Sequence, residues 1–174
     1  EKEVRQIVKE LRPSLIAFAG GLKPLTGLGV STLDAQDVLN LQQSEAATPI
    51  MGPPDRLAYM IYTSGTSGKP RAVMHAHRAV WARRMMWHGW YGLRSDDRLL
   101  HAGAFNWTYT LGTGLMDPWA IGATAMVCKG PTDRQVWGRL VKEHNATIFA
   151  AAPGIYRQIV ESGAEGFEVL RHGL

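Results

Sequence analysis

The sequence has 174 residues, of which 45% are hydrophobic and 20% are charged. A chain of this length can bury roughly 70% of its extended surface, and its composition excludes a wholly disordered protein. No apolar run reaches the ~18 residues of a membrane-spanning helix, and the single cysteine, Cys128, excludes an internal disulfide. We therefore expect a soluble protein without a membrane span, in the reducing environment of the cytoplasm.

The formal net charge of +4 is unevenly distributed along the chain. No acidic residue lies between Asp55 and Asp96, and the cationic residues of that stretch are Arg56, Lys69, Arg71, Arg78, Arg83, Arg84 and Arg94. A solvated helix face beside a basic loop explains such a run. A basic nucleic-acid-binding module is the rival interpretation, because Trp81 and Trp87 are interleaved with the arginines. Aromatic residues at helical spacing are more often core residues, so we expect no nucleic-acid partner.

The first third of the chain predicts only a few elements. Apolar residues at positions 4–11 have helical spacing, and Pro13 ends that pattern. Residues 14–19 (SLIAFA) predict a short buried strand, whereas residues 20–54 form a region rich in loops and linkers, with a weak helix at 34–41. The chain opens in helical register, and a new strand pattern starts five residues before its end. We therefore expect residues 1–174 to be a single segment of a longer polypeptide.

The rest of the chain predicts alternating strands and helices. Strands are predicted at residues 57–62, 72–76, 99–101, 123–127 and 147–151. One helix is predicted at 77–91, a mixed, partly helical segment at 109–119, and another helix after a capping box at 132–135. In a final helix, Ile155, Ile159 and Val160 form the expected buried stripe. This alternation indicates an α/β layered fold with a largely parallel β-sheet flanked by helices.

The segment TSGTSGKPR, residues 63–71, carries the chemistry of a polyphosphate site. Glycines let main-chain N–H groups approach phosphate oxygens, hydroxyl side chains donate further hydrogen bonds, and Lys69 and Arg71 balance the charge. The segment is not a Walker loop, because Thr63 stands where a glycine is required and Pro70 stands where a serine or threonine is required. A flexible Gly/Ser hairpin between two strands is the alternative interpretation.

The string YTSGTSGKPRAV, residues 62–73, closely resembles the phosphate-loop signature of the adenylate-forming superfamily. This superfamily includes acyl-CoA synthetases, firefly luciferase and the adenylation domains of peptide synthetases. The resemblance continues through residues 103–130, where acyl-CoA synthetases have a similar aromatic segment, glycines and a GAT-containing strand. The sequence departs from the family pattern at Arg71 and Ala72, where the family usually has Lys and Gly. The resemblance covers at least residues 57–174 and implies a partial N-terminal, ATP- and acyl-binding domain.

The resemblance also implies an activity, that of an ATP-dependent carboxylic acid–CoA ligase. Such enzymes form an acyl-adenylate and pyrophosphate from ATP and a carboxylate, with Mg²⁺, and then pass the acyl group to a thiol, usually coenzyme A. The residues that would bind the ATP polyphosphate are Thr63, Ser64, Gly65, Thr66, Ser67, Gly68, Lys69 and Arg71.

Several parts of the family's active site have no counterpart in these 174 residues. The adenine motif, the Mg²⁺-binding glutamate, the ribose-binding aspartate and the catalytic lysine of the small C-terminal domain would all lie beyond Leu174. We therefore expect no catalytic or metal-binding residue in this segment. We also expect the isolated segment to be inactive and to self-associate through its uncovered sheet.

Phe105, Trp107 and Tyr109 lie where the family places acyl-pocket residues. Their alternation with polar residues is also that of an ordinary strand with one aromatic face in the core. Peptide-synthetase domains commonly place an aspartate near here to hold the substrate ammonium, but no acidic residue occurs from position 98 to position 116. A non-amino carboxylic acid, aryl or alkyl, is therefore favoured, and a fragment of an amino-acid-activating domain is the alternative.

His75 and His77 would face one side of a strand and could form half of a metal site. No cysteine or carboxylate lies near them in the sequence. We therefore favour packing, or a polar contact to the loop, over metal binding.

Overall fold

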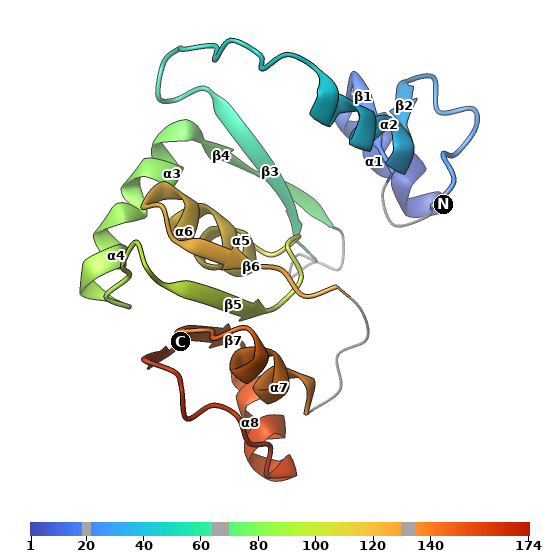
Figure 1. Ribbon diagram of the computed structural model, residues 1–174. Coiled ribbons are helices and arrows are strands. Elements are labelled where there is room, and N and C mark those ends of the chain that lie inside the picture. Colours follow the sequence, from blue (N-terminus) through green and yellow to red (C-terminus); the bar gives the residue numbers. More distant parts are fainter. Residues whose placement is uncertain (19–21, 64–69, 130–134) are drawn as a thin grey trace. The chain divides into compact units, whose positions relative to one another are not determined.

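The computed structural model describes residues 1–18, 22–63, 70–129 and 135–174 (Figure 1). These residues form two compact units, 1–51 and 52–174, which are described separately. Residues 64–69 of the predicted glycine-rich loop and residues 132–134 of the capping box predicted at 132–135 lie outside the described residues.

The first unit is built from short elements in the order α1 (Lys2–Leu11), β1 (Leu15–Ala17), β2 (Ser31–Leu33), α2 (Ala35–Asn40) and the 3₁₀ turn η1 (Leu41–Gln43). Strands β1 and β2 pair in parallel. Helix α1 ends at Arg12, whose backbone is left-handed with φ 47° and whose N–H donates to the carbonyl of Val8. Asp34 caps α2, because its carboxylate accepts the backbone N–H groups of Gln36 and Asp37. The helices at 4–11 and 34–41 were predicted, and strand β2 was not. The predicted strand at 14–19 is present as β1, but the expectation that it is buried was wrong, because Leu15 is 49% exposed.

The second unit contains an antiparallel hairpin and a parallel sheet (Figure 1). Its strands are β3 (Leu57–Thr63), β4 (Arg71–Ala76), β5 (Arg98–Ala102), β6 (Thr124–Met126), β7 (Ile148–Ala151) and β8 (His172–Gly173). Its helices are α3 (His77–Ala82), α4 (Arg84–Gly89), α5 (Thr108–Leu111), the π-helical turn η2 (Gly112–Met116), α6 (Asp117–Ala120), α7 (Val136–Glu143) and α8 (Pro153–Ser162). All of the predicted strands of this region are present, within one or two residues of their expected bounds.

The parallel sheet has the strand order β6-β5-β7-β8 and separates two apolar clusters. Leu100 of β5 and Phe149 of β7 point into the first cluster, which contains side chains of α7 and α8. The neighbouring residues Leu99 and Ile148 point into the second cluster, which Met86 and Trp87 of α4 border. Successive side chains of a strand face opposite sides, so helices cover both faces of this sheet. The predicted α/β fold with a largely parallel sheet is confirmed.

Three local expectations for the second unit were wrong. The segment 77–91 is not one helix, because α3 and α4 are separate and meet at Arg83. Residues 105–109 do not form a strand, since Trp107 precedes α5 and Tyr109 lies within it. In α8, Ile159 is buried as expected, but Val160 is 78% exposed and is not part of the buried stripe.

Within the described part of the chain, no helix has both the length and the apolar character needed to cross a bilayer.

Candidate active site

The two described ends of the glycine-rich loop are held together by the β3–β4 hairpin. Thr63 is the last residue of β3 and pairs with Arg71, the first residue of β4. The Thr63 hydroxyl also donates to the Arg71 carbonyl, at 3.5 Å. Both residues are exposed. The predicted phosphate-binding residues between them, 64–69, lie outside the described residues, so the structure places only the two ends of this predicted site.

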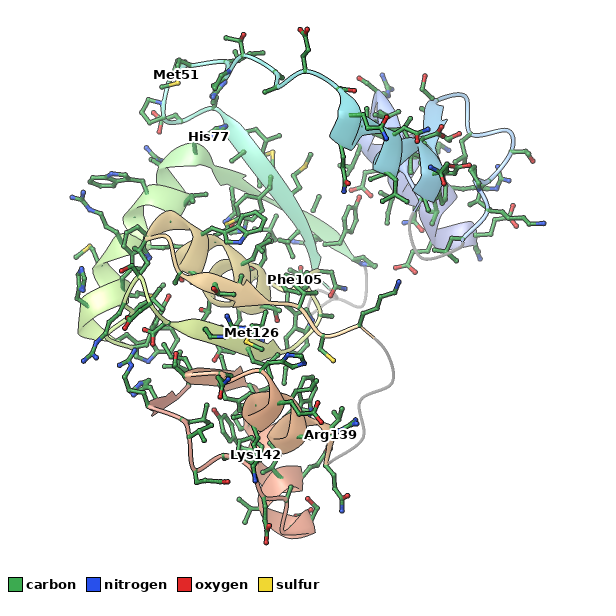
Figure 2. All side chains as sticks on the ribbon, viewed as in Figure 1. Met51, His77, Phe105, Met126, Arg139 and Lys142 are labelled. Atoms are coloured by element: carbon green, nitrogen blue, oxygen red, sulfur yellow. The ribbon has the colours of Figure 1, made fainter. Side chains whose placement is uncertain are left out.

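The predicted acyl-pocket residues follow the carboxyl end of β5. Figure 2 shows Phe105 in the turn beyond that strand, and it is half-buried. Trp107 is 58% exposed, whereas Tyr109, in α5, is half-buried and lies 4.6 Å from the His101 ring, centroid to centroid, in an edge-to-face arrangement. Ligands of open α/β sheets bind outside the carboxyl ends of the strands, where successive connections leave to opposite faces.

The connections of this sheet meet that condition at β5. Elements α5, η2 and α6 connect β5 to its neighbour β6, whereas α7 connects β6 to β7, the neighbour of β5 on its other side. Figure 1 shows α5 and α6 on one side of β5 and α7 on the other. The aromatic segment 105–109 therefore begins at the position where the fold leaves a crevice.

A buried ion pair fixes the helices that follow this segment. Asp117, at the start of α6, is 1% exposed and accepts hydrogen bonds from Nε of Arg83 at 2.9 Å and from Nη2 at 2.6 Å. The indole of Trp87 and the hydroxyl of Tyr91 also donate to its carboxylate. Burial and the neighbouring carboxylate raise the pKa of Tyr91 well above its ordinary value, which keeps this hydroxyl a donor.

The same arginine connects the junction between α3 and α4 to the π-helical turn η2. Nη2 of Arg83 donates to Thr113 Oγ1 at 3.1 Å, so the guanidinium joins the α3–α4 junction to η2. A side chain at Gly112 would collide with this guanidinium, which explains a glycine at that position. π-Helical turns inside α-helices are frequent at functional sites.

His101 and Thr110 form a second buried polar group close to the aromatic segment. His101, in β5, is 3% exposed and Thr110, in α5, is fully buried. Within the described ranges, the two imidazole nitrogens of His101 have no hydrogen-bond partner, and the Thr110 hydroxyl has none either. Burial lowers the pKa of His101 to about 4, so its imidazole is neutral at pH 7.

His75 and His77 do not form a shared site in the structure. The ring of His75 stacks on Tyr59 of β3 at 4.7 Å, with an angle of 7° between the planes, whereas His77 is the first residue of α3. The described residues contain no group of three or more His, Cys, Asp or Glu side chains arranged to hold a metal ion. The packing interpretation of His75 is therefore the one that its stacked ring supports.

Comparisons with known proteins agree with the loop and the sheet. The sequence matches the family of AMP-binding enzymes over residues 2–173. The chain belongs to this family. Among curated members it is 34% identical over 124 residues to a 3-hydroxybenzoate–CoA ligase of Aromatoleum sp. (strain CIB), and 35% identical over 111 residues to a 3-hydroxybenzoate–CoA/4-hydroxybenzoate–CoA ligase of Thauera aromatica. The family resemblance predicted from residues 62–73 is confirmed.

These relatives are considerably longer than the chain. The matches cover 70% and 64% of this chain but only 24% and 21% of the two ligases. Among solved structures, the anthranilate CoA ligase AuaEII in complex with anthranoyl-AMP superposes with a TM-score of 0.82 and 20% identity, over 99% of this chain and 36% of that one. This structural similarity shows that the chain shares its fold with part of that protein.

Sequence reasoning missed both buried polar groups of this region. Arg83 and Asp117 are 34 residues apart, and no local pattern connects them. His101 does carry a local signal, because this histidine directly follows two leucines in a buried strand. A polar residue inside an apolar strand needs a partner or a function, and that signal could have identified it.

Proposed function

We propose that the full-length protein containing this chain is an AMP-forming carboxylic acid–CoA ligase, and that this chain supplies its polyphosphate loop and part of its acyl pocket. The observation that carries the proposal is the family match over residues 2–173, in a chain whose YTSGTSGKPRAV string joins strands β3 and β4. ATP, Mg²⁺ and coenzyme A are its proposed cofactors and co-substrates, and the cytoplasm its proposed location.

The proposed role of residues 63–71 is to hold and neutralise the β- and γ-phosphates of ATP. The hydroxyls of Thr63, Ser64, Thr66 and Ser67 and the cations Lys69 and Arg71 form a donor set that fits a polyphosphate. A carboxylate oxygen of the acid then attacks the α-phosphorus, and pyrophosphate leaves. Catalysis of such a displacement depends mainly on positioning and charge stabilisation, which is what a loop of this composition supplies.

We propose an aromatic acid as the substrate class. The two curated relatives named above are hydroxybenzoate–CoA ligases, and the predicted acyl-pocket residues Phe105, Trp107 and Tyr109 offer aromatic surface at the carboxyl end of β5. An amino-acid substrate is less well supported, because the two carboxylates that flank this segment in the chain, Asp97 and Asp117, are already bound by Arg171 and Arg83. Neither of these two carboxylates is therefore free to bind a substrate ammonium.

The proposal is tested by measuring AMP and acyl-CoA formation by the full-length protein with Mg-ATP, coenzyme A and a panel of benzoates, aliphatic acids and amino acids. Turnover of benzoates is expected, and the isolated 174-residue chain is expected to turn over none of the acids. Replacing Thr66 and Ser67 together with Ala should lower adenylate formation at least about tenfold, because charge-assisted hydrogen bonds to phosphate are lost. Ser95→Ala, at an exposed position, is the control. Absence of turnover with every acid, or wild-type rates in the double variant, would contradict the proposal.

A further inference from the structure

Three buried polar atoms at the carboxyl end of β5 lack a hydrogen-bond partner among the described residues: Nδ1 and Nε2 of His101 and Oγ1 of Thr110. A neutral imidazole offers one donor and one acceptor, and a hydroxyl offers both. Buried polar groups are almost always paired, and an unpaired one carries its full desolvation penalty. Three such atoms in two neighbouring elements therefore indicate that something outside the described chain completes their hydrogen bonds.

The backbone of Gly103 packs closely against both side chains. A Cβ atom at Gly103 would collide with Oγ1 of Thr110 and would lie 3.1 Å from Nδ1 and Cε1 of His101. On another side, a Cβ atom at Gly114 would lie 2.8 Å from Cβ of His101. Gly103 itself is exposed. Glycine at these positions thus lets the backbone approach the imidazole and the hydroxyl closely, and at Gly103 this backbone reaches the surface.

The position of this group associates it with the predicted acyl pocket. His101 is the penultimate residue of β5, and the ring of Tyr109 lies edge-to-face against its imidazole at 4.6 Å. Thr110 follows Tyr109 directly in α5. A ligand bound against the aromatic segment 105–109 would therefore have these two side chains at one end.

An uncharged ligand group fits the surroundings of His101 and Thr110 better than a charged one. Burial keeps the His101 imidazole uncharged at pH 7, by lowering its pKa to about 4. Arg83 and Asp117, the ion pair that holds η2, are satisfied by each other and by Trp87. A carboxylate or an ammonium would thus be buried without a counter-charge, which is costly, whereas a hydroxyl can donate to one of these groups and accept from another.

We propose that His101 and Thr110 form the polar end of the acyl pocket and determine specificity by binding a hydroxyl group carried by the acyl part of the substrate. This inference rests on the proposed function and goes beyond it, because it assigns the recognition of a substituent to two residues outside the predicted aromatic triplet. A pocket that hydrogen-bonds a substrate hydroxyl discriminates strongly against the analogue that lacks it, since the protein's polar groups are then left unpaired.

The test compares kcat/KM of the full-length protein for 3-hydroxybenzoate, 4-hydroxybenzoate and benzoate. Wild type is expected to prefer at least one hydroxybenzoate to benzoate. Thr110→Val keeps the shape of the side chain and removes its hydroxyl, so the preference should fall about tenfold, mainly through slower turnover of the hydroxylated acid. Thr113→Val is the matched control, because Thr113 is equally buried but its hydroxyl is used by Arg83. This control should keep the wild-type ratio.

Failure of the inference and failure of the proposed function give different results. An active enzyme whose hydroxybenzoate-to-benzoate ratio is unchanged in both Thr110→Val and His101→Gln would overturn the inference alone, and the group would then enclose a structural water. A wild-type enzyme that prefers benzoate would do the same. A protein that turns over no acid at all would overturn the proposed function and this inference with it.

Discussion

Asp117 and His101 are both buried polar residues of the same unit, and they differ in how completely the protein satisfies them. Asp117 accepts hydrogen bonds from three side chains, those of Arg83, Trp87 and Tyr91. His101 has no hydrogen-bond partner within the part of the chain that the structure describes. The first residue connects α6 to the α3–α4 junction, and the second lies at the end of β5 beside Tyr109.

This difference separates a structural network from a candidate binding site. A buried carboxylate with a full set of donors can hold its neighbours in place, but it has no capacity left for a ligand. A buried imidazole without partners contributes little to stability and keeps its hydrogen-bonding capacity for another molecule. The Asp117 network would thus position η2 and α5, on which Thr110 and Tyr109 are carried, while His101 and Thr110 would contact the substrate.

The largest loss of stability is expected when Asp117 is replaced. Asp117→Ala leaves Arg83 as an uncompensated buried charge and removes the acceptor of Trp87 and Tyr91, so we expect a loss of about 3–5 kcal/mol in the free energy of unfolding. Urea denaturation of the full-length protein measures this loss. Asp96→Ala, at an exposed position nearby, should change it by less than about 0.5 kcal/mol. Equal effects of the two substitutions would contradict a structural role for the Asp117 network.

The lowered pKa of His101 should make the stability of the protein depend on pH in the acid range. Its pKa is about 4 in the folded protein and about 6.5 when unfolded, so only the unfolded chain binds a proton between these values. Stability should therefore fall as the pH is lowered from 6.5 to 4, by up to about 1.4 kcal/mol for each pH unit. His101→Leu should remove this slope in urea denaturation measured across the window, and His88→Leu controls for the loss of one histidine. An unchanged slope in His101→Leu would show that the imidazole is protonated in the folded protein.

Asp97 is a second buried carboxylate whose hydrogen bonds are satisfied, and its pKa is also lowered in the folded protein. Burial would raise the pKa of this carboxyl, but hydrogen bonds from Arg171, Thr147 and the backbone of Arg94 outweigh burial and lower it. Its stabilisation is thus present above its unfolded pKa and is lost as the pH falls through the lower folded pKa.

Replacement of this carboxylate gives the smallest of the three stability effects. Asp97→Asn should cost about 1.5–3 kcal/mol at pH 7, because hydrogen bonds to a charged group are lost, and the difference from wild type should shrink below about pH 4. Urea denaturation at pH 7 and at pH 3 measures both values. A difference that stays constant between these two pH values would contradict the assignment of the effect to the ionised carboxylate.

Elements with a strong local pattern could be predicted from the sequence. Helix α7 was predicted because Val136, Trp137 and Val141 have helical spacing, and the structure buries all three. The ion pair of Arg83 could not be predicted, because its partner Asp117 lies 34 residues away in the chain. Val160 was misassigned because its apolar character matched the stripe, although the helix turns it to the surface. Local periodicity identifies an element, whereas the face that is finally covered depends on the neighbouring elements.

Only part of the candidate site could be predicted from the sequence. The loop string identified the family, because its combination of glycines, hydroxyls and cations is specific enough to recognise in one dimension. The assignment of Phe105, Trp107 and Tyr109 to the acyl pocket stays a prediction. The alternative interpretation of these residues as a strand was wrong, because Trp107 precedes α5 and Tyr109 lies within it. His101 and Thr110 lie close together only because α5 packs near the end of β5, and such tertiary packing cannot be predicted from the local sequence.

The central claim, that the unsatisfied group at the end of β5 binds a substrate hydroxyl, is tested most directly by ¹⁵N NMR of the histidine side chains. The full-length protein, labelled at its imidazole nitrogens, is titrated with 3-hydroxybenzoate, 4-hydroxybenzoate and benzoate, and the His101 signals are assigned by their loss in His101→Gln. We predict that a hydroxybenzoate shifts an imidazole nitrogen of His101 by forming a hydrogen bond, and that benzoate leaves it nearly unchanged. Identical responses to the hydroxylated and unsubstituted acids at saturation would contradict the claim.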